Sequence, residues 1–188
     1  MCLGDAIIKF ARTGIIHNNE ELKELYSTID FKSPSSKIIP IDKDKFTIVS
    51  PFNFRYITYQ FDKSLTQKTW CPEHIFTNRQ IHALYHYYES KGIKMIDVGH
   101  YKYHLKEAAN IIFHAETHVG LCSGMGWLSV ACGKNPDIWY ATETDCKFIK
   151  WAKQRWKDNN VIVNYFDKCF FYKPCSIAYD GLIYEHKQ

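Results

Sequence analysis

The second half of the chain alternates short apolar runs with amphipathic stretches, and this alternation constrains the fold more than any other feature. The apolar runs lie at 94–99, 118–122, 136–140 and 161–163, and the helical patterns at 73–91, 104–115, 125–132 and 143–157. Strands that alternate with helices form parallel sheets with helices on both faces. The sequence therefore predicts an α/β fold, a Rossmann-like parallel sheet covered by helices on both faces.

The N-terminal part of the chain has a different pattern. Residues 1–30 read as helical, and prolines and serines make 31–45 a loop or linker. The run 45–51 ends in Ser-Pro and predicts a short buried strand. We expect an N-terminal helical segment and linker over 1–45 and an α/β domain over 46–188. The apolar positions at helical spacing in the first segment are Ile7, Ile8, Ala11 and Ile15.

Composition narrows the class of protein. Of the 188 residues, 46% are hydrophobic and 23% charged, which excludes a disordered chain. No apolar stretch approaches the roughly 20 residues that cross a bilayer, and no secretory signal is visible at the start. The 7 cysteines form no Cys-x-x-Cys pair, as in a cytoplasmic protein with reduced thiols. A net charge of +4 suits a phosphorylated ligand and does not require nucleic acid.

One turn between a strand and a helix carries most of the chemical information. The strand stops at Cys122, small residues follow, and the helix begins near Met125. A helix N-terminus has unpaired N–H groups and a partial positive charge, so it suits a phosphate. Gly124 and Gly126 would let a ligand approach the backbone, and Ser123 could add a hydroxyl. The alternative is a tight turn whose glycines serve packing alone, and the pattern leaves both open.

The same turn resembles the donor-binding motif of GT-B glycosyltransferases, most closely the heptosyltransferase family, glycosyltransferase family 9. Two segments upstream strengthen the resemblance. Lys68-Thr69-Trp70-Cys71-Pro72-Glu73 is similar to the family's Lys-x-Trp-Pro element, and Leu3-Gly4-Asp5-Ala6-Ile7-Ile8 to its Gly-Asp motif. The three segments occur in the family's order.

The resemblance implies a nucleotide-diphosphate sugar as donor substrate, with no further cofactor and no metal on the diphosphate. It places the diphosphate on Ser123, Gly124, Met125 and Gly126. It also implies Lys68 as the cation that stabilises the departing nucleotide and Asp5 as the general base for an acceptor that the sequence does not identify.

The chain also departs from the family's pattern. Cys122 stands where the family has Asp, and Trp127 where it has His. The part of the chain before Lys68 is much shorter than the family's acceptor domain, so that lobe is reduced, absent or supplied by a second subunit of a homo-oligomer. Two functions therefore stay open: a glycosyltransferase-like enzyme, or a non-catalytic module that binds a nucleotide or sugar nucleotide.

Two further patterns are open to a functional and a structural interpretation. Histidines four residues apart could share a metal on one helix face with a third ligand, but no Glu stands in the catalytic His-Glu-x-x-His arrangement, and we expect no metal site. A basic stripe over 147–157 predicts a solvated helix face with its two tryptophans toward the core, in preference to a nucleic-acid surface. The histidine pairs are His82/His86, His100/His104 and His114/His118, and the stripe consists of Lys147, Lys150, Lys153, Arg155 and Lys157 with Trp151 and Trp156.

Overall fold

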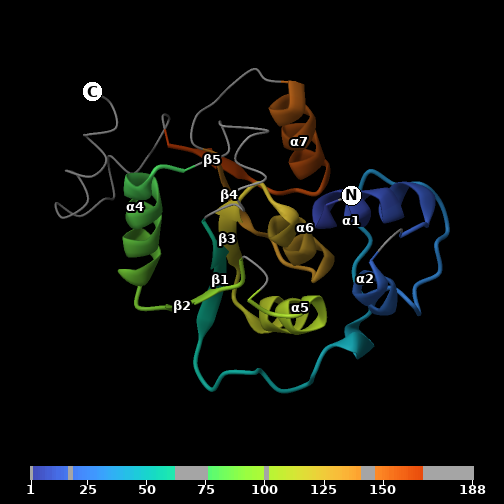
Figure 1. Ribbon diagram of the computed structural model, residues 1–188, viewed down its shortest axis with the longest axis horizontal. Helices are drawn as coiled ribbons and strands as arrows, with labels where there is room; N and C mark the ends of the chain where they lie inside the picture. The colour runs from blue at the N-terminus through green and yellow to red at the C-terminus, as the bar shows by residue number, and fades with distance from the viewer. Residues whose placement is uncertain (1, 17–18, 62–75, 100–101, 141–146, 167–188) are drawn as a thin grey trace.

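The computed structural model describes residues 2–16, 19–61, 76–99, 102–140 and 147–166. Five strands form one sheet in the order β2-β1-β3-β4-β5, and every neighbouring pair is parallel (Figure 1). The predicted α/β fold is therefore confirmed. In chain order the elements are α1 (Leu3–Thr13), α2 (Glu20–Leu25), the 3₁₀ helix η1 (Lys43–Lys45), β1 (Tyr56–Gln60), α4 (Asn78–Glu89), β2 (Lys94–Asp97), α5 (Leu105–His114), β3 (His118–Leu121), α6 (Gly124–Ala131), β4 (Asp137–Tyr140), α7 (Lys147–Asp158) and β5 (Val163–Tyr165).

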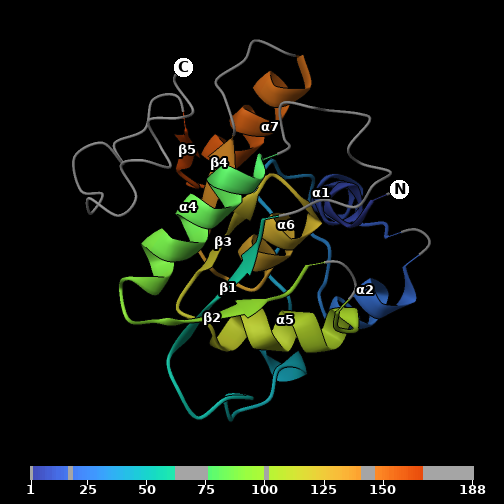
Figure 2. The same ribbon diagram turned by 60° about the vertical axis from the view of Figure 1, so that its left-hand side comes forward.

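Helices cover both faces of the sheet, as Figures 1 and 2 show from two sides. Helix α4 packs on one face through residues such as Leu84, while α5, α6 and α7 bury Leu128 and Trp156 on the other. Successive strand residues point to opposite faces. Accordingly, Trp139 of β4 belongs to the core under α4, and Tyr140 to the core under the other three helices.

The N-terminal helix α1 lies against α6, and its apolar side chains enter the same core as α5, α6 and α7. Ile7 is fully buried and Phe10 nearly so. Gly14 ends the helix in the left-handed conformation with φ of 70°, which favours glycine. Ile15, which the sequence pattern placed on this helix, therefore lies beyond it and is 48% exposed. The domain boundary expected at residue 45 stays a prediction.

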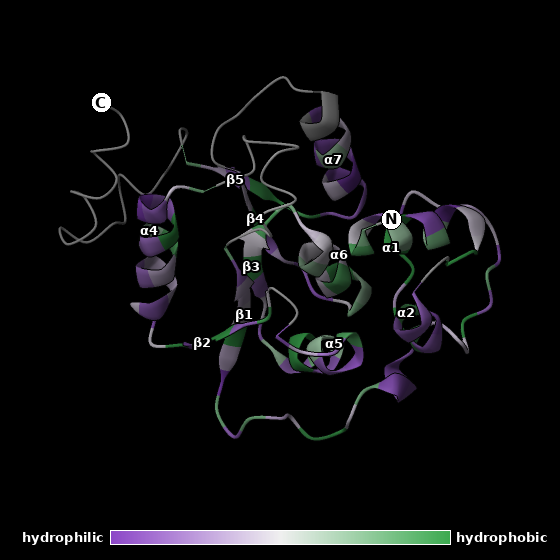
Figure 3. Ribbon diagram, in the orientation of Figure 1, coloured by the Kyte–Doolittle hydropathy of each residue, from purple (hydrophilic) through white to green (hydrophobic). Residues whose placement is uncertain are grey.

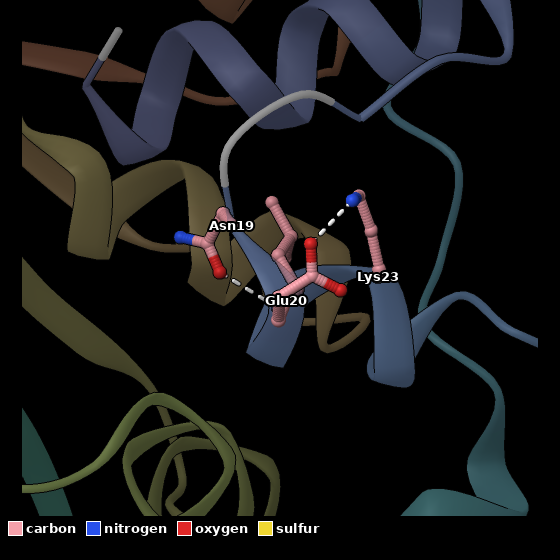
Figure 4. A network of polar contacts seen from close by, with 4 residues as sticks. Asn19, Glu20 and Lys23 are labelled. Atoms are coloured by element: carbon pink, nitrogen blue, oxygen red, sulfur yellow. Dashed lines mark hydrogen bonds and ion pairs between the residues drawn. The ribbon is translucent and has the colours of Figure 1, made fainter.

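The short helix α2 is stabilised by its own polar side chains (Figure 4). Asn19 caps it, because its Oδ1 accepts a hydrogen bond from the backbone N–H of Leu22 at 2.8 Å. One turn of the helix is bridged by Lys23 Nζ and Glu20 Oε1, 2.5 Å apart. These contacts compensate for the small helix length, since six residues make few backbone hydrogen bonds.

One predicted strand is wrong. The run 45–51 forms no strand, and Ile48 and Val49 are 99% and 76% exposed. The first strand of the sheet is β1, Tyr56–Gln60, which pairs with β2 on one side and β3 on the other. Its aromatic and β-branched residues suit a central strand better than an apolar run that finds no partner.

Candidate functional site

The topology of the sheet singles out one position on its edge. From β1 the chain moves to β2 on one side, then returns past β1 to β3, β4 and β5 on the other. The connections that leave the carboxyl ends of β1 and β3 therefore run in opposite directions, with α4 on one face and α6 on the other. In open parallel sheets, a crevice at such a switch point is the usual ligand site. The predicted turn at Ser123 follows β3 at this point.

A buried glutamine at the end of β1 joins this turn. The Ser123 hydroxyl donates to Gln60 Oε1 at 2.5 Å, and Gln60 is only 8% exposed. Two glycines make room for it: Gly99, two residues after β2, beside its side chain, and Gly120 on β3 beside its backbone. A Cβ added at Gly99 would lie 2.9 Å from Gln60 Cγ, and one added at Gly120 would lie 2.6 Å from the Gln60 carbonyl oxygen. The two strand ends are thus tied together by a side chain that the sequence pattern did not identify.

The N-terminus of α6 keeps its first N–H groups without a side-chain cap. Ser123 occupies the N-cap position, but its hydroxyl is turned to Gln60, and no side chain in the described part of the chain caps this helix. Capping by serine would normally satisfy an N–H of the first turn. The N–H groups at 124–126 and the positive end of the helix dipole are therefore available to an anion.

The start of α1 packs directly on the start of α6. A Cβ added at Gly4 would lie 2.6 Å from Trp127 Cδ1, and one added at Gly124 would lie 2.9 Å from Leu3 Cβ and 3.3 Å from the Gly4 nitrogen. The absence of a side chain at Gly124 thus lets the two helices approach. Two helix N-termini with the same partial charge lie side by side, an arrangement that a bound anion would stabilise.

Gly126 has a packing role of the same kind. A Cβ there would lie 2.9 Å from Ile138 Cδ1 and 3.1 Å from Trp156 Cη2. The ring of Trp156 in turn stacks on Trp127, with centroids 3.4 Å apart and planes 4° from parallel. Packing therefore accounts for both glycines of the turn, and their role toward a ligand stays a prediction, as does that of Met125.

Cys122, at the position where the family has Asp, is part of the core. It is 7% exposed, and its side chain is hydrogen-bonded with that of Tyr140. Trp156 Nε1 donates to the same tyrosine hydroxyl at 3.1 Å, and burial raises the pKa of Tyr140. The side chain at this position faces the α6–α7 layer.

Asp5, the expected general base, is exposed on the first turn of α1. Its Oδ2 accepts a hydrogen bond from the Cys2 thiol at 3.0 Å, and burial raises the pKa of that thiol, which keeps it protonated. Asp5 lines a groove that also contains Trp151 of α7, and it forms no hydrogen bond or ion pair with the 123–126 turn among the described residues. Lys68, the expected cation, lies outside the described residues.

The structure also places residues of the two remaining sequence patterns, the histidine pairs and the basic stripe over 147–157. No group of three or more potential metal ligands occurs within the described ranges. His118 is buried in β3, whereas the Nε2 of its expected partner, His114, lies 2.6 Å from the Thr47 carbonyl oxygen. On α7, Trp156 is fully buried as expected, but Trp151 is 38% exposed. The prediction that both tryptophans face the core is therefore wrong for Trp151.

The chain was compared with family models, curated proteins and solved structures. No protein-family model and no curated protein matches the chain. One similar solved structure is the bacterial iron-containing dodecameric glycosyltransferase TibC from enterotoxigenic E. coli H10407, with 16% identity and a TM-score of 0.44 over 57% of this chain and 32% of that one. Another is the dodecameric iron-containing heptosyltransferase TibC in complex with ADP-D-beta-D-heptose, with 13% identity and a TM-score of 0.46 over 82% of this chain and 50% of that one.

The chain thus spans half or less of the length of these two structures. Likeness at this level carries no argument about activity. None of the helices in the described part of the chain has the length and hydrophobicity that crossing a bilayer requires.

Proposed function

We propose that the chain binds a nucleotide-diphosphate sugar at the carboxyl edge of its sheet and transfers the sugar to an acceptor, as a glycosyltransferase-like enzyme. The observation that carries the proposal is the uncapped start of α6 at the switch point between β1 and β3, with Ser123 turned to Gln60. Backbone N–H groups at such a helix start bind phosphate without a metal. The resemblance to glycosyltransferase family 9 supplies the substrate class.

In this proposal each group has one task. The N–H groups at 124–126 hold the diphosphate, and Lys68 neutralises part of its charge. When the donor binds, the Ser123 hydroxyl turns its one hydrogen bond from Gln60 Oε1 to a phosphate oxygen. Asp5 takes the proton of the acceptor hydroxyl while that oxygen bonds to the anomeric carbon. The bond between the anomeric carbon and the phosphate oxygen breaks, and the nucleoside diphosphate leaves with the electron pair.

A second candidate is a module that binds a nucleotide or sugar nucleotide without catalysis. The packing of α1, which contains Asp5, favours this candidate. Ile7 and Phe10 share one core with α6 and α7, and this core holds the helix in place. Asp5 also lines the groove beside Trp151, and it forms no hydrogen bond with the described residues of the 123–126 turn. With its general base away from the donor, the protein would bind the ligand without catalysing transfer.

Calorimetry with ADP, UDP, GDP and ADP-heptose tests binding, and release of nucleoside diphosphate from the sugar nucleotide tests turnover. Ser123→Ala should weaken binding of the ligand that the wild type prefers. Ser129→Ala is the matched control, because Ser129 lies on the same helix with a buried hydroxyl that has no partner among the described residues. Binding without turnover would favour the module, and absence of binding by the wild type would refute both candidates.

A further inference from the structure

A groove between α1 and α7 lies beside the predicted donor site and has a different chemical character. Trp151 is 38% exposed in it, and the Arg155 guanidinium carbon lies 5.6 Å from the centroid of the indole ring. That distance is within the range of a cation–π interaction. An indole is thus held at the surface, next to the charged side chains of α1. The groove is lined by Asp5, Ile8, Lys9, Arg12, Thr13 and Trp151.

The positive charge of the chain is concentrated on the two helices that form this groove. Helix α7 contains five Lys and Arg residues and one Asp, and α1 contains two and one. Together they carry a formal charge of +5, which exceeds the +4 of the whole chain. Figure 3 colours much of α7 as hydrophilic. The remainder of the chain therefore has a formal charge of −1.

Two of these cations have no counter-ion within the described part of the chain. Lys9 and Arg12 are one helical turn apart on α1, and neither forms an ion pair with any described residue. Asp5, the one carboxylate among the described residues that line the groove, is hydrogen-bonded to Cys2. A ligand with several negative charges and a flat aromatic group would match both the cations and the indole.

We propose that the α1–α7 groove binds single-stranded nucleic acid, with a base stacked on Trp151 and backbone phosphates on Lys9 and Arg12. Stacking on an exposed aromatic side chain within a basic groove is the usual way in which proteins hold single strands. A duplex hides the faces of its bases and offers the indole nothing to stack on. A single anionic group would engage Lys9 or Arg12 and leave the indole unused. The groove shares Asp5 with the proposed transferase site, but the indole and the two cations on which this proposal rests have no part in the sugar transfer.

The test is fluorescence anisotropy of a labelled oligothymidylate of about 12 nucleotides, titrated at roughly 50 to 200 mM salt. Trp151→Leu should weaken binding roughly 5- to 150-fold, the effect of one lost stacking contact. The double variant Lys9→Gln/Arg12→Gln should lower the slope of log affinity against log salt by about 1.4, because two phosphate contacts are lost. Unchanged melting temperatures would show that the variants fold.

The matched control is Lys43→Gln/Lys91→Gln, which removes the same charge at two exposed positions outside the groove and should leave the slope unchanged. Any of four results would overturn the proposal. The first two are no binding by the wild type at the lowest salt, and equal slopes of log affinity against log salt for the groove variant and the wild type. The other two are a duplex that binds as tightly as the single strand, and thymidine monophosphate that competes as well as the oligonucleotide.

Discussion

The buried histidine of β3 predicts how the stability of the protein depends on pH. His118 has no exposed surface, its Nδ1 lies 3.1 Å from Thr58 Oγ1, and its Nε2 has no partner among the described residues. With the proton on Nδ1 toward Thr58, the unpartnered Nε2 is an acceptor, which costs less than a buried N–H without a partner. Burial lowers the pKa of His118 to about 3.

The sign follows from comparing the folded and unfolded chains. In the unfolded chain this imidazole takes up a proton as the pH falls through about 6.5, whereas in the folded protein it stays neutral down to about 3. The unfolded state therefore binds more protons over this window, and the free energy of unfolding falls as the pH falls. Each pH unit below about 6.5 costs about 1.4 kcal/mol, so the loss at about pH 5 is roughly 2 kcal/mol.

His118→Leu removes this titration together with the unpartnered nitrogen. Thr58 keeps an acceptor, because its hydroxyl also lies 3.4 Å from the Thr117 carbonyl oxygen. Urea unfolding at about pH 7 and about pH 5 should show the difference in free energy between variant and wild type shifting by roughly 2 kcal/mol in favour of the variant. His82→Gln, at an exposed position on α4, should show no such shift. An equal difference at both pH values would refute a buried neutral imidazole.

Gly126→Ala should lower the free energy of unfolding in urea by about 1–3 kcal/mol, because the new Cβ would approach Ile138 Cδ1 to 2.9 Å and Trp156 Cη2 to 3.1 Å. Ser123→Ala should weaken nucleoside diphosphate binding in calorimetry by about 0.5–1.5 kcal/mol, the contribution of one neutral hydrogen bond. Lys68→Ala should weaken it by about 1.5–3 kcal/mol, since a charge-assisted contact is stronger. Full affinity in either of the last two variants would remove that residue from the site.

The sheet after residue 94 could be predicted from sequence because each strand and helix there has a local pattern. The first strand could not, because the apolar run 45–51 is the more hydrophobic segment, although Tyr56–Gln60 finds partners on both sides. The role of Gln60 was not predicted either, because Gln60 is the last residue of this strand. Its contact with Ser123 depends on the pairing of β1 with β3, which sets Gln60 opposite Gly120. Register between distant segments is not visible in a local pattern.

The exposure of Trp151 could have been predicted. Trp156 follows Trp151 by five positions, and at about 100° per residue their side chains project about 140° apart around the helix axis. When a helix packs on the protein core with one side only, two residues so placed cannot both point into that core. Hydrophobic character led to the wrong prediction, and helical geometry would have corrected it.

The glycines of the 123–126 turn show how a motif and its function can be separated experimentally. Gly124 is required where α1 meets α6 and Gly126 where α6 meets the sheet and α7, so their presence is explained without a ligand. Gly124→Val would drive its side chain into Leu3, and a loss of nucleotide binding would then follow from damage to the fold as readily as from an obstructed site. The informative change is at Ser123, whose hydroxyl contacts Gln60 and whose removal adds no atoms. If Ser123→Ala keeps the melting temperature and weakens nucleotide binding while Ser129→Ala does not, the turn binds the ligand as well as connecting a strand to a helix.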